Sequence, residues 1–97
     1  MTDALERLSI WYLAQCENDW YEDKGIKLDT LDNPGWRMTI DIALTRLQET
    51  TFARVEVDRS EHDWVRIWRT DKTFEFACGP LNLREAVESF LDWAEEQ

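Results

Sequence analysis

The stretch 25–42 restricts the fold of this chain most strongly, because it predicts a β-hairpin. In residues 26–31, Ile-Lys-Leu-Asp-Thr-Leu, the side chains alternate as in a strand with two unlike faces. Asn33-Pro34-Gly35 then reverses the chain: proline presets φ at the second position of a type II turn, and glycine takes the positive φ at the third. The alternation resumes from Trp36 to Ile42. The stretch therefore predicts two antiparallel strands joined by a type II turn.

A helix is predicted on each side of the strands. In residues 3–16, capped by Thr2 or Asp3, the helical spacing places an apolar stripe of Leu5, Leu8, Tyr12 and Cys16 on one face. After Gly79-Pro80, Asn82 and Glu85 have the spacing of a capping box that begins a last helix. The apolar stripe of that helix is Leu83, Val87, Phe90, Leu91 and Ala94.

Three more strands are predicted at 52–58, 64–70 and 73–78, with a polar loop at 59–63. Residues 43–51 are compatible with a strand end or with one helical turn. In the strand 64–70, Val65 and Ile67 continue the apolar face of the preceding strand. Trp64, Arg66 and Trp68 then point to the other face, which is either an exposed aromatic patch or covered by a helix.

These elements predict an α+β fold over a single domain, residues 1–97. An N-terminal helix, an antiparallel sheet of about five strands in a meander, and a C-terminal helix follow one another. Both helices are expected on one face of the sheet, where Leu5, Leu8, Tyr12, Val87, Phe90 and Leu91 would be buried against Val55, Val57, Val65 and Ile67.

The chain is strongly acidic, with 21 Asp and Glu against 11 Lys and Arg and a formal net charge of −10. Such a charge repels phosphate backbones and anionic membrane surfaces, so nucleic acid and membranes are not expected partners. It favours a basic partner, or it serves solubility alone. Most of the excess lies outside the central strands, so one side of the molecule is strongly negative if the two helices pack together.

Residues 17–24 are predicted to form an acidic loop around Trp20 and Tyr21. Its carboxylates allow three interpretations: a solvated loop, a partner-binding loop, or a metal or acid–base site. The pattern of ligands in a calcium loop is absent, and His62, the single histidine, has no evident nucleophile or second ligand. The sequence thus predicts no catalytic residue, metal or cofactor.

The location expected from sequence is the cytoplasm. The first ten residues include Asp3, Glu6 and Arg7 and lack the basic start and apolar run of a signal peptide. Cys16 and Cys78 lie far apart without a metal-type spacing and are expected to be reduced thiols.

Several motifs in the first half of the chain resemble the immunity protein 53 family of bacterial polymorphic toxin systems. They are Leu8, Trp11-Tyr12, Cys16, Asp19-Trp20, Gly25-Ile26, Thr30-Leu31-Asp32-Asn33-Pro34-Gly35-Trp36, Ile40-Asp41-Ile42 and Thr45. Trp20 is followed here by Tyr21 and Glu22, where an acidic residue and a histidine are expected in the family. The resemblance implies a small, non-enzymatic cytoplasmic protein that binds and neutralises a toxin domain.

Two sets of residues are the predicted partner-binding sites. The first, on one edge, is Glu17, Asp19, Trp20, Glu22, Asp23 and Asp32; the second is Trp64 and Trp68. Acidic residues would steer a basic toxin, such as a nuclease, and aromatic residues would anchor the contact that occludes its active site. The alternatives are a small acidic adaptor unrelated to toxins and a small enzyme that uses the carboxylates near Trp20. The oligomeric state is left open.

Overall fold

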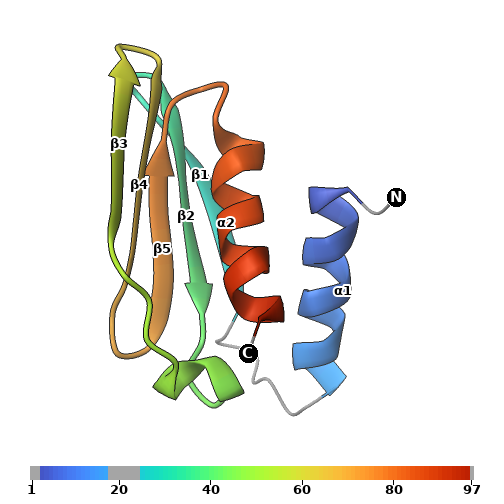
Figure 1. Cartoon of the computed structure of the whole chain (residues 1–97). Helices are drawn as coiled ribbons and strands as arrows, with labels where there is room; N and C mark the ends of the chain where they lie inside the picture. The colour runs from blue at the N-terminus through green and yellow to red at the C-terminus, as the bar shows by residue number, and fades with distance from the viewer. Residues whose placement is uncertain (1–2, 18–24, 97) are drawn as a thin grey trace.

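The structure, a computed structural model, describes residues 3–17 and 25–96 as one antiparallel sheet with two helices on one of its faces (Figure 1). The elements in chain order are α1 (Ala4–Glu17), β1 (Ile26–Leu31), β2 (Gly35–Asp41), the 3-10 helix η1 (Arg46–Glu49), β3 (Val55–Ser60), β4 (Asp63–Arg69), β5 (Thr73–Cys78) and α2 (Leu83–Glu95). The predicted α+β fold is confirmed. Within the described ranges, no helix has the length and apolar character needed to cross a membrane.

The sheet has the strand order β1-β2-β5-β4-β3, and all neighbouring strands are antiparallel. The predicted simple meander is therefore wrong at one place, since β2 pairs with β5 instead of β3. This order puts β5, whose Phe74 and Phe76 are fully buried, at the centre of the sheet. The predicted polar loop 59–63 is also shorter than expected, because β3 extends to Ser60 and β4 begins at Asp63.

The β1–β2 hairpin forms where the sequence predicts it, but its turn differs. The Asn33–Pro34 peptide bond is cis, and Gly35 does not have a positive φ, so the predicted type II turn is wrong. Glycine is required at position 35 for another reason. A Cβ there would lie 2.3 Å from the backbone oxygen of Cys78 on β5, which is closer than any side chain could approach.

The core lies between the sheet and α2 and is rich in aromatic rings. Phe74 of β5 packs edge-to-face on Phe90 of α2, with ring centroids 4.9 Å apart, and stacks on Trp93 at 5.3 Å. Such pairs contribute about 0.5–1.5 kcal/mol each beyond the burial of their surface. The apolar face predicted for α2 is largely confirmed, since its buried residues are Ala86, Val87, Phe90, Leu91, Trp93 and Ala94.

Helix α1 forms where predicted, but a different face of it packs against the protein. Ala4 is buried, and Leu8 and Trp11 pack against the core. The predicted burial of Leu5 and Tyr12 is wrong, because these side chains are 74% and 47% exposed. The reason is that α1 lies beside α2 and not directly on the sheet (Figure 1).

A polar network joins the β3–β4 hairpin to the start of α2. Asn82 is the N-cap residue, but its side chain makes no capping hydrogen bond. The predicted capping box of Asn82 and Glu85 is therefore not formed. The Nδ2 of Asn82 instead donates to Asp63 at 2.9 Å and to Glu85 at 3.1 Å, and its Oδ1 accepts the N–H of Trp64. Arg59 pairs with Asp63 at 2.7 Å and with Glu85 at 2.6 Å. Hydrogen bonds from Asn82 and Arg59 lower the pKa of Asp63, and those from Arg59 and Asn82 lower the pKa of Glu85.

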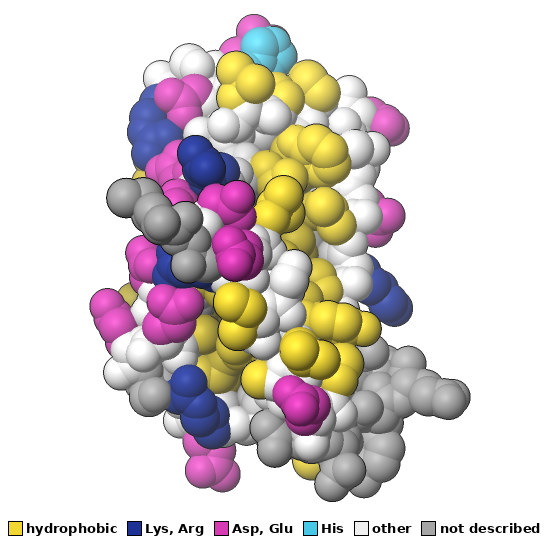
Figure 2. All heavy atoms as spheres, turned by 90° about the vertical axis from the view of Figure 1, so that its right-hand side faces the viewer, with side chains coloured by type: hydrophobic (Ala, Val, Ile, Leu, Met, Phe, Trp, Pro, Cys, Tyr) yellow, Lys and Arg dark blue, Asp and Glu magenta, His cyan; other side chains and the backbone are white. Residues whose placement is uncertain are grey.

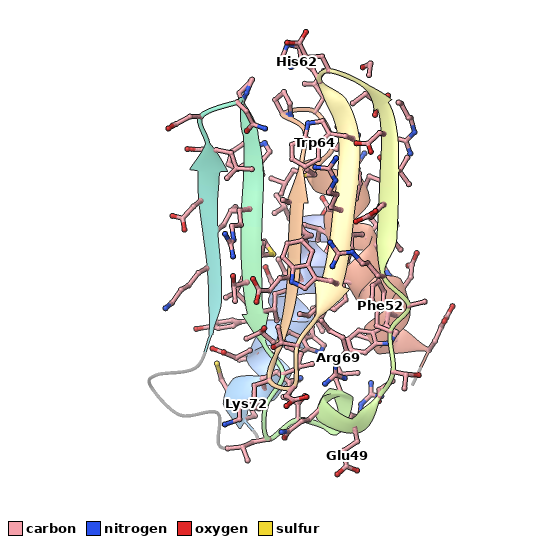
Figure 3. The ribbon with its side chains drawn as sticks, turned by 90° about the vertical axis from the view of Figure 1, so that its left-hand side faces the viewer. Glu49, Phe52, His62, Trp64, Arg69 and Lys72 are labelled. Carbon is pink, nitrogen blue, oxygen red and sulfur yellow. The ribbon has the colours of Figure 1, made fainter. Side chains whose placement is uncertain are left out.

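Arg69, at the end of β4, holds the segment that contains η1 (Figure 3). Its guanidinium donates to the backbone oxygens of Leu47 at 3.0 Å, Gln48 at 2.7 Å and Thr50. The region 43–51, for which the sequence allowed a strand end or a helical turn, thus contains the short 3-10 helix η1, and one arginine binds carbonyl groups within it and just after it.

Candidate partner-binding surfaces

The face of the sheet opposite the helices is open and carries a nearly balanced set of charges (Figure 3). Three ion pairs lie on it: Arg37–Glu75 at 3.1 Å and Arg66–Asp58 at 3.0 Å between strands, and Arg54–Glu56 at 3.0 Å along β3. Partly exposed pairs of this kind are worth between zero and about 1 kcal/mol each. Because these cations are already paired with anions of the same face, the open face offers no strong field to a charged partner.

The two tryptophans predicted on this face lie there, and no helix in the described part of the chain covers them. Trp64 is nevertheless only 7% exposed. Its ring extends toward β2, where a Cβ on Gly35 would lie 3.4 Å from Cζ2 of the indole, and the guanidinium of Arg66 lies 5.3 Å from the ring centroid. Trp68 is half-buried, with the guanidinium of Arg54 5.5 Å from its ring centroid. Trp64 is therefore packed into the folded structure, whereas part of the surface of Trp68 is exposed to solvent.

The predicted acidic set is only partly described by the structure. Glu17 is exposed at the end of α1, and Asp32 is exposed in the β1–β2 turn. These two residues lie at opposite ends of the molecule, since α1 ends where β1 starts and Asp32 follows the far end of β1 (Figure 1). They do not form one cluster. The remaining members, Asp19, Trp20, Glu22 and Asp23, lie outside the described residues.

The two helices and their flanking residues carry much of the excess negative charge. Their acidic residues are Asp3, Glu6, Glu17, Glu85, Glu88, Asp92, Glu95 and Glu96, against Arg7 and Arg84. Arg7 joins the helices by pairing with Asp92 at 2.9 Å and Glu95 at 2.7 Å. Figure 2 shows charged side chains gathered along one side of the helix face. The helix side is thus more acidic than the open sheet face, as the sequence predicts for two helices that pack together.

An apolar groove of about 290 Å³ opens between α1, β1 and α2. Its apolar lining consists of Ala4, Leu5, Leu8, Leu28, Met38, Leu83 and Val87, and Asp3 and Arg84 are its charged members. Figure 2 shows apolar side chains in a band along this face. The groove exists because α1 packs on α2 and leaves Leu28 of β1 44% exposed.

The single histidine and the two cysteines lie in different parts of the described structure. No three His, Cys, Asp or Glu side chains among the described residues form a group that could hold a metal ion. His62 is exposed in the turn between β3 and β4. Cys78 is buried, and burial raises the pKa of its thiol to about 11, whereas Cys16 is exposed.

The family model of immunity protein 53 matches residues 5–95. The chain belongs to the immunity protein 53 family. Among curated proteins and solved structures, none matches the chain significantly.

The match reaches further than the motifs that carry the resemblance. Those motifs ended at Thr45, whereas the family match of this immunity protein continues through β3, β4, β5 and α2. The membership predicted from the first half of the chain is therefore confirmed for nearly all of it.

The groove is the surface of this immunity protein that sequence reasoning missed. A signal was available in α1, because helical spacing puts Ile10 and Leu13 on the side opposite Leu8 and Trp11, and both sides cannot face one neighbour. The exposure of Leu28 could not be predicted from the sequence, because it depends on where α1 packs.

Proposed function

We propose that this immunity protein binds a cognate toxin domain and neutralises it by occluding the toxin's active site. Membership of the immunity protein 53 family over residues 5–95 is the observation that carries the proposal. Steric occlusion is the simplest mechanism for a protein that offers binding surfaces, and it requires no chemistry from the immunity protein itself.

The toxin is proposed to be basic, and a nuclease domain would have this property because it must bind phosphate. The net charge of −10 supports this choice. Complementary charge raises the rate of association and suppresses binding to wrong partners. The helix side, where the acidic residues gather, would face the toxin during approach.

The proposed first contact set is Glu17 with Asp19, Trp20, Glu22 and Asp23, which follow it directly in the chain. The exposure of Glu17 at the end of α1 supports this assignment. Asp32 would act as a separate acidic contact at the other end of β1. On the open sheet face, the exposed part of Trp68 would contribute apolar area beside Arg54, and the burial of Trp64 makes it a support for that face.

The test is a capture experiment with the tagged protein from its native cells, eluted by rising salt and analysed by mass spectrometry. We expect a basic toxin domain that elutes at high salt and whose activity in a purified assay is lost on adding an equimolar amount of the immunity protein. Recovery of housekeeping proteins alone, with the toxin expressed, would contradict the proposal and favour the adaptor.

A further inference from the structure

The outer edge of β1 is an unpaired strand edge in the part of the chain that the structure describes. β1 is the first strand in the sheet order and pairs only with β2 (Figure 3). The other edge strand, β3, is interrupted by a register shift between Asp58 and Ser60, a device that limits pairing with further strands. β1 has no such irregularity, and no proline lies within it.

The hydrogen-bond pattern shows which residues of β1 present their backbone groups to this edge. The N–H of Asp41 donates to the oxygen of Gly25, directly opposite it in the register, at 3.1 Å. Since hydrogen-bonded and non-hydrogen-bonded pairs alternate in an antiparallel ladder, Lys27, Asp29 and Leu31 bond to β2. The N–H and C=O groups of Ile26, Leu28 and Thr30 consequently point outward.

We propose that β1 pairs with β1 of a second copy of this chain, in an antiparallel register centred on Leu28. In this register Leu28 lies opposite Leu28 of the second copy, and Ile26 lies opposite Thr30. These are the residues whose backbone groups are free at the edge, so each opposing pair can exchange two hydrogen bonds. The result is one continuous sheet with both helix layers on the same side.

The side chains of β1 are complementary to themselves in this register. Lys27 of each copy lies opposite Asp29 of the other on the open face, which makes two cross-strand ion pairs. On the helix side, Leu28, which is 44% exposed and lines the apolar groove, meets its counterpart. Opposite charges and apolar pairs in direct cross-strand positions both stabilise a sheet. The net charge of −10 opposes association at long range, but salt at 0.15 M screens charges over about 8 Å.

The test measures mass by sedimentation equilibrium at 0.15 M salt over a range of concentrations. We expect the wild-type protein to approach twice the 11.6 kDa of one chain. Lys27→Glu and Asp29→Lys should each weaken self-association roughly tenfold, because each replaces both ion pairs by like charges. An equimolar mixture of the two variants should associate again, since the mixed pair has Glu opposite Lys and Asp opposite Lys.

A backbone variant tests the same edge independently of charge. Leu28→Pro removes an N–H that points away from β2, so it should prevent association while the monomer keeps its thermal unfolding midpoint within a few degrees. A single-chain mass for the wild type at every concentration would overturn the proposal. So would a dimer that persists in Leu28→Pro and in both charge variants. If the wild type is a monomer and Leu28→Pro loses affinity for the toxin, the edge serves the toxin instead.

Discussion

At the scale of single residues, Arg69 stabilises a segment whose conformation the local sequence leaves open. The periodicity of residues 43–51 does not decide their conformation, although the Thr45 hydroxyl accepts the N–H of Leu47 at the start of η1. The conformation is stabilised by a guanidinium from β4 that binds the carbonyl oxygens of Leu47, Gln48 and Thr50. A planar group with five N–H donors can satisfy several carbonyl oxygens at once.

Arg69→Lys should therefore destabilise the protein although it keeps the charge. Lysine has three donors on one atom and cannot reach carbonyl oxygens spread over residues 47–50. We expect the free energy of unfolding in urea to fall by about 2 kcal/mol, because carbonyl groups are left without a donor. Arg54→Lys is the matched control, since Arg54 makes one exposed ion pair, with Glu56. Equal losses in the two variants would show that Arg69 has no special role.

At the scale of elements, ion pairs and hydrogen bonds join the β3–β4 hairpin to the start of α2. Arg59, Asp63, Glu85 and Asn82 link two elements that lie far apart in the chain. The folded state lowers the pKa of Asp63 and of Glu85, so it binds their protons less readily than the unfolded chain does. The stabilisation is therefore present above the unfolded pKa values near 4, and it is lost as pH falls through the lowered, folded values.

Arg59→Gln should accordingly destabilise the protein at pH 7 and not in acid. We expect a lower urea midpoint than that of the wild type at pH 7, and a difference that shrinks steadily once pH falls below about 4. Arg54→Gln, which removes a cation outside this network, should change the midpoint little at either pH. A difference between Arg59→Gln and wild type that is constant from pH 7 to pH 2.5 would contradict the network's role.

The elements show which parts of the structure local sequence could predict. The β1–β2 hairpin was predictable because its alternation and its turn residues are adjacent in the chain. The packed face of α1 was not, because apolar residues lie on opposite sides of the helix, with Leu5 and Leu13 on one and Trp11 on the other, and only its neighbour α2 decides which side is buried. The pairing of β2 with β5 and the burial of Trp64 against Gly35 likewise join segments distant in sequence. For the candidate site, the sequence predicted the residue types and the charge, but not the groove beside α1.

At the scale of the whole molecule, the location of negative charge should affect the rate of association with the toxin more than the amount of charge does. We expect the combined variant Glu17→Gln, Asp19→Asn, Glu22→Gln and Asp23→Asn to associate with the toxin roughly tenfold more slowly, with a flatter dependence on salt. The control variant removes the same charge from exposed carboxylates away from the helix side: Glu49→Gln, Asp58→Asn, Glu61→Gln and Asp71→Asn. Stopped-flow measurements at several salt concentrations compare the two. Equal rates and equal salt slopes would exclude the loop as the site of steering.

The contrast between an acidic helix layer and a nearly balanced sheet face gives the protein a permanent electric dipole that lies across the sheet. A cationic protein therefore exerts a torque on it as well as an attraction, and rotation precedes contact. The net charge sets how often the two molecules meet, whereas this asymmetry sets which side arrives first. A surface on the helix side can thus profit from steering even where its own contacts are apolar, as they are in the groove beside α1.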